Sequence, residues 1–209
     1  LIEKIRDSRE NIQNELAALQ QTSGASKATG MLAALKSEEA GVGDDLLGRL
    51  GDLGGIDKKY DIAASTACGG LNHLVTKTVN GAQKCTDFLR ANNLGRATFI
   101  VLEKIQYLNE AMNNFTATKK LKKEKCPRLF DLVTPLNDDV RVAFYYAMRD
   151  TLVSKTLDQA SQIAYEGNKC IYRVVSLKGE LIELSEVIAS ISLSSAKILM
   201  NKPAAAKGQ

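Results

Sequence analysis

The sequence predicts an α/β (α+β) protein made of two similar mixed subdomains joined by a basic linker. Three observations lead to this fold class. Helical and strand-like patterns alternate from residue 60 onward at the scale of α/β units. The alternation stops in a polar stretch at 103–126 and then starts again. Before the first series lies a glycine-rich string at 47–57, which predicts sharp turns or close backbone approach.

The first 20 residues predict the end of a coiled coil. Their apolar positions alternate in steps of three and four, the a/d spacing of a heptad, with one charged defect. The seam consists of Ile2, Ile5, Arg9, Ile12, Leu16 and Leu19. Because fewer than three heptads are marginal as an isolated helix, we expect this arm to need a partner helix. Residues 21–46 are assigned as a linker, since a Ser-Gly-Ala-Ser stretch at 23–26 interrupts the pattern before a short helix at 31–39.

Residues 47–112 form the first predicted subdomain. The glycine string leads into a helix at 58–68, which two glycines close, and then into a strand at 73–78. An amphipathic helix follows at 79–91. Its apolar face consists of Ala82, Cys85, Phe88 and Leu89. A strand at 97–102, apolar enough to be buried, comes next, and residues 103–126 are predicted as polar and loop-like. Residues 113–128 are assigned as the basic linker between the two subdomains.

Residues 129–184 form the second predicted subdomain. Its elements are a strand at 129–133, a turn at Pro135, a helix at 139–148, a strand at 151–154 and a helix at 157–166. Asn137 or Asp138 begins the first helix, and Thr156 with Gln159 forms a capping box for the second. Two final strands, at 170–176 and 180–184, flank a hairpin turn at 177–179. Residues 185–209 are assigned to a returning arm and tail.

Positive charge is concentrated at 119–128. This segment holds six basic residues and one acid, a local charge of +5, whereas the whole chain carries +4, so the remainder is nearly neutral at −1. Such a cluster attracts the phosphates of DNA through counterion release, without sequence preference. The alternative is a solvated loop that keeps the protein soluble. The predicted DNA-binding residues are Lys119, Lys120, Lys122, Lys123, Lys125 and Arg128.

The glycine string does not match a known phosphate-binding loop. It lacks the Lys-Ser or Lys-Thr pair of a P-loop, and its glycines at 48, 51, 54 and 55 do not have the spacing of a dinucleotide turn. A structural loop is one interpretation. A nucleotide- or small-molecule-binding α/β enzyme domain that uses Gly48–Gly55 is the alternative function that we keep open.

The composition argues against most catalytic and metal chemistry. His73 is the single histidine, and the four cysteines at 68, 85, 126 and 170 form no C-x-x-C pair. We therefore predict no catalytic residue, no metal ligand and no cofactor in this stretch, and reduced thiols. No run approaches the roughly 18 apolar residues of a membrane span, so we expect no membrane partner. The missing initiator Met favours a fragment of a longer protein.

Several longer sequence motifs resemble those of the hinge domain of SMC (structural maintenance of chromosomes) proteins. They begin with Gly-Arg-Leu-Gly-Asp-Leu-Gly-x-Ile-Asp at 48–57 and Tyr-Asp at 60–61. Asn-Leu-Gly-Arg-Ala-Thr-Phe-Ile follows at 93–100. Pro-Arg-Leu-Phe-Asp-Leu-Val at 127–133 and Arg-Asp-Thr-Leu-Val at 149–153 are similar to the condensin subunit 4 type rather than to cohesin. The resemblance covers roughly 47–183.

The resemblance implies a hinge with two mixed α/β subdomains between antiparallel coiled-coil arm ends. It implies pairing with a subunit 2 type condensin hinge, weak DNA contact and a role in chromosome condensation in mitosis. The parent ATPase, with its ATP and magnesium, would lie in a distant head domain. The implied location is the nucleus and chromosome, with cytoplasm in part of the cell cycle. Gly48, Gly51, Gly54 and Gly55 are predicted at or beside the dimer interface, where strand edges pair.

The chain departs from the family pattern after residue 184. Where the family carries Ser-Gly-Thr-Met-Ser-Gly-Gly-Gly at the subunit junction, this chain has no glycine between 185 and 192. Glu186, Ser190 and Ile191 are the predicted interface residues there. Their side chains add bulk at a contact where glycine allows two strands to approach.

Overall fold

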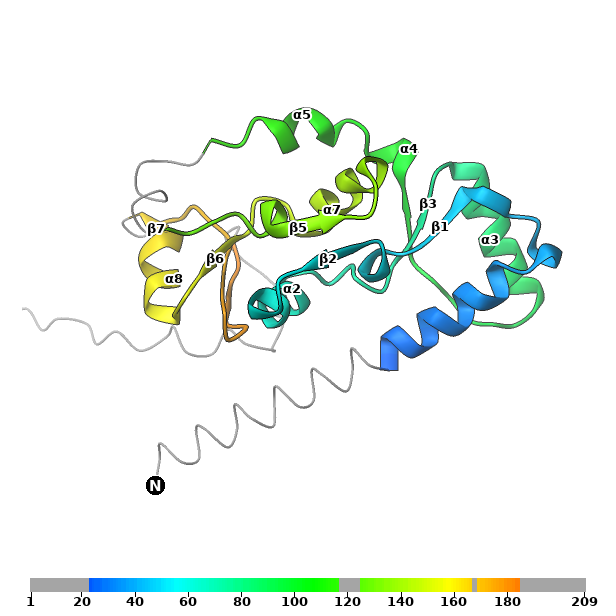
Figure 1. The fold of residues 1–209 in the computed structure, drawn as a ribbon, viewed down its shortest axis with the longest axis horizontal. Helices are drawn as coiled ribbons and strands as arrows, with labels where there is room; N and C mark the ends of the chain where they lie inside the picture. The colour runs from blue at the N-terminus through cyan, green and yellow to red at the C-terminus, as the bar shows by residue number, and fades with distance from the viewer. Residues whose placement is uncertain (1–22, 117–124, 167–168, 185–209) are drawn as a thin grey trace, which may run out of the picture. The chain divides into compact units, whose positions relative to one another are not determined.

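The computed structural model describes residues 23–116, 125–166 and 169–184, which form two compact units (Figure 1). Unit 1 contains the described residues of Leu1–Gly55, Gly70–Ala111 and Pro135–Ala147. Unit 2 contains those of Ile56–Gly69, Met112–Thr134 and Met148–Gln209. The two predicted subdomains are continuous in sequence, whereas each unit includes a helix-bearing segment that lies within the other predicted half.

Unit 1 is built on a three-stranded sheet of order β1-β3-β4. β1 (Leu46–Arg49) runs antiparallel to β3 (Leu74–Thr76), and β3 runs parallel to β4 (Phe99–Val101). α3 (Val79–Ala91) is the connection between the two parallel strands, as a parallel pair requires. Residues 23–35 are helical and pack with α3 against the sheet (Figure 1). The buried cluster includes Met31, Leu35, Leu46, Leu74, Cys85 and Leu89.

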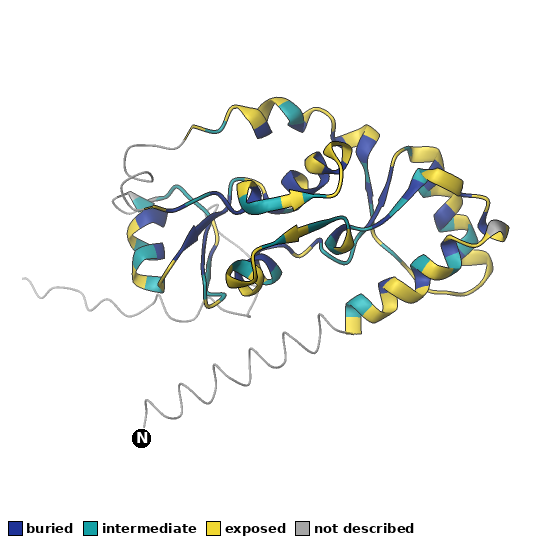
Figure 2. Cartoon of the chain, viewed as in Figure 1, coloured by how far each residue is buried: buried dark blue, intermediate teal, exposed yellow. Residues whose placement is uncertain are grey.

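α3 has the bounds that its sequence pattern predicts. The Thr78 hydroxyl accepts a hydrogen bond from the Gly81 amide at 3.0 Å, which caps the helix. The same hydroxyl donates to the Asp45 carboxylate at 3.1 Å. Cys85 and Leu89, four residues apart, are buried on one face. In Figure 2 buried and exposed positions alternate around α3, so amphipathic spacing and one cap account for this helix.

Unit 2 repeats the parallel strand-helix-strand connection in a sheet of order β10-β9-β6, but its antiparallel strand pairs with the second strand of the parallel pair, whereas that of unit 1 pairs with the first. β6 (Leu152–Ser154) runs parallel to β9 (Val174–Ser176), and β9 runs antiparallel to β10 (Leu181–Ile182). α8 (Leu157–Ala164) connects the parallel pair, and Thr156 accepts from the Gln159 amide at 3.2 Å as the predicted capping box requires. β7 (Tyr165–Glu166) and β8 (Lys169–Cys170) form a small hairpin. α2 (Asp61–Ala67) belongs to this unit and lies near β9.

Corresponding segments confirm the prediction of two similar halves. Leu-Val-Thr-Lys-Thr at 74–78 corresponds to Leu-Val-Ser-Lys-Thr at 152–156, each a strand followed by a helix cap. The main-chain hydrogen bonds correspond as well. The Leu74 amide donates to the Thr98 carbonyl and the Leu152 amide donates to the Arg173 carbonyl, each at 2.9 Å. Sequence and hydrogen bonding therefore describe one supersecondary unit used twice.

Short helices and one small sheet complete the description. β2 (Gly54–Ile56) pairs with β5 (Val133–Pro135). α4 (Leu102–Ile105), α5 (Leu108–Asn113) and α7 (Arg141–Met148) are α-helical. The 3₁₀ turns are η1 (Glu38–Ala40), η2 (Gly43–Asp45), η3 (Leu50–Asp52), η4 (Lys58–Tyr60), η5 (Leu129–Leu132) and η6 (Asp138–Val140).

Four predictions about local structure are wrong. The polar loop predicted after residue 103 contains α4 and α5, because buried apolar side chains recur every three or four residues at Leu102, Ile105, Leu108 and Met112. The strand predicted at 129–133 is η5, and Pro135 ends β5 rather than forming a turn. The break predicted at 23–26 is helical, since packing of residues 28–35 outweighs the low helix propensity of Gly24. The coiled-coil arm predicted at 1–20 lies outside the described residues.

Candidate functional site

The glycine string forms the bend between β1 and β2. β1 carries a bulge between Leu46 and Gly48, and Gly48 has a φ of +144°, a conformation that side chains rarely adopt. The Leu50 amide donates to the His73 carbonyl at 2.9 Å, and the Gly51 amide donates to the Leu71 carbonyl at 2.9 Å. The Leu53 amide donates to the Leu50 carbonyl at 3.1 Å. These amides are used inside the protein, which argues against a loop that cradles a phosphate.

Gly51 is constrained by contact rather than by a positive φ. Of the glycines at 48, 51, 54 and 55, Gly48 is the one that has a positive φ. A Cβ on Gly51 would lie 3.2 Å from the Leu71 carbonyl oxygen. Gly55, in contrast, is exposed, and its Cβ would meet nothing within 4 Å. Gly51 and Gly55 therefore differ in how much room their surroundings leave for a side chain.

Arg49 and Asp52 hold the bend together. The Arg49 Nε donates to the Asp52 carboxylate at 2.9 Å, and its Nη1 donates to the Asn72 side-chain oxygen at 3.1 Å. The hydrogen bond from Arg49 lowers the pKa of the Asp52 carboxyl. Both charges are thus committed to each other within unit 1.

The basic run is described only at its end. Lys119, Lys120, Lys122 and Lys123 lie outside the described residues, and Lys125 is exposed. Arg128 is only 6% exposed. Its guanidinium donates to Asp131 at 2.7 Å, to Asp150 at 3.0 Å and to the Met112 carbonyl at 3.2 Å. We therefore remove Arg128 from the predicted DNA-binding residues, because its donors are used inside unit 2.

Arg128 also lies against two aromatic rings. Its guanidinium carbon is 4.6 Å from the Phe115 ring centre and 5.0 Å from that of Phe130. Arg49 and Asp52 in the first half correspond to Arg128 and Asp131 in the second, since both pairs stand in an Arg-Leu-x-Asp-Leu sequence. This structural role is not visible in the sequence, because Arg128 is the last basic residue of a segment whose local pattern is that of a solvated loop.

The sheets end in strands that have no further partner among the described strands. The outer strands are β1 and β4 in the unit 1 sheet and β10 and β6 in the unit 2 sheet. Such edges present unpaired N–H and C=O groups to another chain. The tail residues Glu186, Ser190 and Ile191, predicted at the junction that follows β10, lie outside the described residues.

The described part of the chain can be checked for side chains that could hold a metal ion. It contains no group of three or more His, Cys, Asp or Glu side chains that could hold a metal ion. His73 is half-buried, and burial lowers its pKa. Burial raises the pKa of the Cys85 thiol to about 11, away from the reactive thiolate form. None of the helices in the described ranges has the length and apolar character needed to cross a membrane.

Comparison with known families gives one match, the SMC proteins Flexible Hinge Domain, over residues 43–164. Curated relatives are named Structural maintenance of chromosomes protein 4. The Xenopus laevis protein is 42% identical over 153 residues, which is 73% of this chain and 11% of the relative. The Schizosaccharomyces pombe protein is 47% identical over 138 residues, 66% of this chain and 10% of the relative. The chain thus spans about a tenth of the length of these relatives.

Solved structures share the fold at low sequence identity. The hinge domain of the Pyrococcus furiosus SMC protein aligns with a TM-score of 0.60 at 22% identity, covering 88% of this chain and 94% of that one. An asymmetric dimer of the Geobacillus stearothermophilus SMC hinge domain aligns with a TM-score of 0.54 at 18% identity, covering 93% and 83%. These likenesses support the architecture of two mixed α/β units.

Proposed function

The chain belongs to the SMC flexible hinge domain family, and on that premise we propose that it is the dimerisation module of a condensin-type SMC subunit. Its partner would be the hinge of a second condensin SMC subunit, of the subunit 2 type. The observation that carries this proposal is the pair of outer strands, β4 and β10, since a partner strand can extend a sheet there through main-chain hydrogen bonds. The amide bonding inside the glycine string argues against the alternative of a nucleotide-binding enzyme domain.

The register of β4 indicates which of its groups would meet a partner strand. Leu74 lies opposite Phe99, and the Leu74 amide donates to the Thr98 carbonyl. In a parallel pair, residues that bond to the neighbour alternate with residues that point away. Thr98 and Ile100 therefore face β3, whereas the main-chain groups of Phe99 and Val101 face the outer edge.

We expect Val101→Pro to weaken pairing with a subunit 2 type condensin hinge by about tenfold or more, because an unpaired buried group costs about 1–3 kcal/mol. Proline removes the outward N–H of Val101 but no hydrogen bond to β3. The dissociation constant can be measured by calorimetry. The matched control is Ile100→Pro, which removes the N–H on the inner side and should lower the melting temperature. If Val101→Pro pairs as tightly as the parent, β4 is not the pairing edge.

We further propose that the basic run contacts DNA weakly and without sequence preference. Reversing the charge of Lys119, Lys120, Lys122 and Lys123 to Glu should abolish most binding at low salt, because these cations would release counterions from the phosphates. A fluorescence anisotropy titration against duplex and single-stranded DNA measures this loss. The control reverses four exposed lysines outside the run, Lys36, Lys58, Lys84 and Lys104, and makes the same change in net charge. Equal loss in both variants would indicate a general charge effect and no local DNA site.

The tail gives a second test of the pairing proposal. If residues 185–192 occupy the junction, glycine at 186, 190, 191 and 192 should tighten pairing with the subunit 2 type hinge, because Glu186 would otherwise be buried without a counter-charge and Ile191 would need extra space. The dissociation constants of this chain and of the four-glycine variant decide the question. Equal or weaker pairing by the variant would show that this tail does not form the junction.

The proposed role is non-catalytic. ATP hydrolysis with magnesium would belong to the head domain of the parent protein, and we propose no cofactor for the hinge itself. The proposed location is the nucleus and the chromosome, with cytoplasm during part of the cell cycle, as for a protein that organises chromosomes in mitosis.

A further inference from the structure

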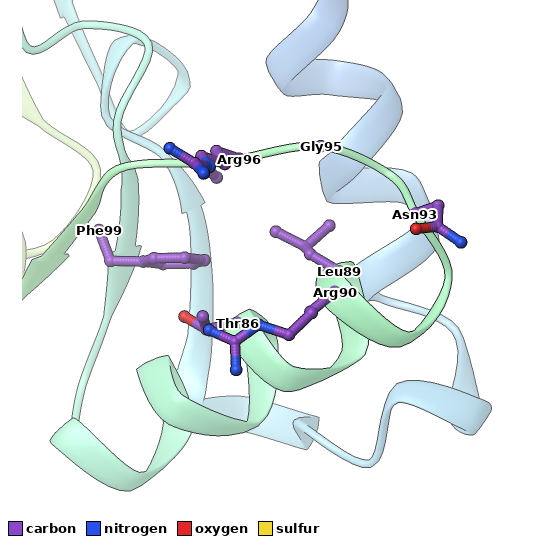
Figure 3. A pocket seen from close by; sticks show the side chains of 8 residues that line it. Thr86, Leu89, Arg90, Asn93, Gly95, Arg96 and Phe99 are labelled. Atoms are coloured by element: carbon purple, nitrogen blue, oxygen red, sulfur yellow. The ribbon is translucent and has the colours of Figure 1, made fainter.

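Unit 1 contains a pocket lined by side chains, among them that of Phe99 in β4, whereas the proposed pairing uses the main chain of that strand. It has a volume of about 540 Å³ and lies between α3 and the loop that leads into β4 (Figure 3). The α3 residues Leu89 and Arg90 line it, together with the loop residues Asn93, Gly95 and Arg96 and with Phe99 of β4. In the view of Figure 3, the Arg90 and Arg96 guanidinium groups lie on either side of the Phe99 ring.

The charge of this pocket is of one sign. Two of its lining residues are arginines, and none is acidic. In the described ranges neither Arg90 nor Arg96 forms an ion pair, unlike Arg49, Arg128 and Arg173. A third cation is close, because the Lys27 Nζ lies 3.8 Å from the place that a Cβ on Gly95 would take. Two arginines in the lining and a lysine beside Gly95, with no acidic side chain among the described lining residues, favour an anionic ligand.

The loop that carries Arg96 has a defined conformation. The Leu94 amide donates to the Leu89 carbonyl at 3.0 Å, and the Asn93 amide donates to the Arg90 carbonyl at 3.3 Å, which ties the loop to the end of α3. Gly95 has a φ of +97°, and a Cβ there would lie 3.0 Å from the Met31 side chain. Main-chain bonds and close packing thus fix the backbone at residues 93–95, next to Arg96, and less backbone ordering is needed when a ligand binds.

The wall between the arginines is apolar. Leu89 is buried and Phe99 is half-buried, and both pack in the core of unit 1. Guanidinium groups match phosphate oxygens in a bidentate manner, and an aromatic face can stack against a ring. A ligand with a phosphate and a ring would use both features.

We propose that this pocket binds a phosphate monoester whose ring lies against Phe99, such as a nucleoside monophosphate. Arg90 and Arg96 bind the phosphate from two sides, and Asn93 offers an amide at the rim. The site lies within unit 1 and does not depend on pairing with a second hinge.

The test uses the full chain and adenosine 5′-monophosphate as the probe, with binding followed by calorimetry. The double variant Arg90→Gln, Arg96→Gln should bind the probe more than tenfold more weakly, because charge-assisted hydrogen bonds to the phosphate are lost. Both side chains are exposed, so the melting temperature should not change. The double variant Lys84→Gln, Lys104→Gln is the matched control, since it removes two exposed positive charges of unit 1 outside the pocket. Unchanged affinity in the double variant, or an equal loss in the control, overturns the proposal.

Two further measurements identify the source of the phosphate and the role of the ligand's ring. Inorganic phosphate should bind more weakly than the nucleotide. Phe99→Leu should lower the affinity for the nucleotide and leave the affinity for inorganic phosphate unchanged. An oligothymidylate without terminal phosphate supplies only diesters, and its affinity should be the same in the double variant as in the parent. If the double variant no longer binds the oligothymidylate but still binds the nucleotide, the pocket binds a DNA strand and the monoester assignment is wrong. Pairing with the partner hinge, measured in parallel, should be unaffected.

Discussion

Replacing Arg128 with leucine is expected to lower the free energy of unfolding by about 3 kcal/mol, the lower end of the cost of breaking a buried ion pair. The change removes hydrogen bonds to Asp131, Asp150 and the buried Met112 carbonyl. It also removes the cation from two aromatic rings. The two carboxylates are 45% and 47% exposed, so water compensates them in part, whereas the carbonyl stays unpaired. Urea unfolding followed by circular dichroism measures the effect.

The corresponding residue of the first half is the matched control. Arg49 is 19% exposed, and its partner Asp52 is 50% exposed. Arg49→Leu should therefore cost only about 1 kcal/mol, as for a pair near the surface. A similar loss in the free energy of unfolding at the two positions would mean that the burial of Arg128 does not stabilise the fold. Arg128 would then be counted again among the predicted DNA-binding residues.

Gly51→Val is the second change with a large expected effect. The added Cβ would lie 3.2 Å from the Leu71 carbonyl oxygen and 3.7 Å from the Arg49 guanidinium carbon, and a β-branched side chain cannot turn away from both. The Gly51 amide bonds to that same carbonyl at 2.9 Å, so relief of the contact strains the hydrogen bond. We expect a loss of about 1–3 kcal/mol, the usual range for overpacking, measured as a fall in the unfolding midpoint.

Gly55→Val separates folding from pairing at the same string. Its Cβ meets nothing within 4 Å, so the variant should melt like the parent. If Gly55 lies at the interface, the valine should still weaken pairing with the subunit 2 type hinge. Unchanged pairing with unchanged melting would remove Gly55 from the predicted interface, and unchanged melting of Gly51→Val would contradict the close contact with Leu71.

Local patterns were enough to predict the elements that carry their own signals. α3 and α8 were predictable because a threonine cap precedes an amphipathic spacing of buried residues. The hairpin of β9 and β10 was predictable because Gly179, with a φ of +86°, lies between two apolar runs. α4 and α5 were missed because each has at most six residues, too few for their apolar spacing to stand out against many polar neighbours.

The sequence by itself determined the fold class, the family and the repetition of one strand-helix-strand unit, since these depend on hydrophobic periodicity, helix caps and sequence motifs. The tertiary structure alone decided which segments join which unit, as with α2, which lies in unit 2 although its sequence falls in the first half. It likewise decided that Arg128 is a structural cation. An arginine next to five lysines has the local pattern of a solvated run, and its environment is set by Asp150 and Met112, which only folding brings to it. Burial is a property of the contacts between distant segments, and for that reason the local sequence could not show it.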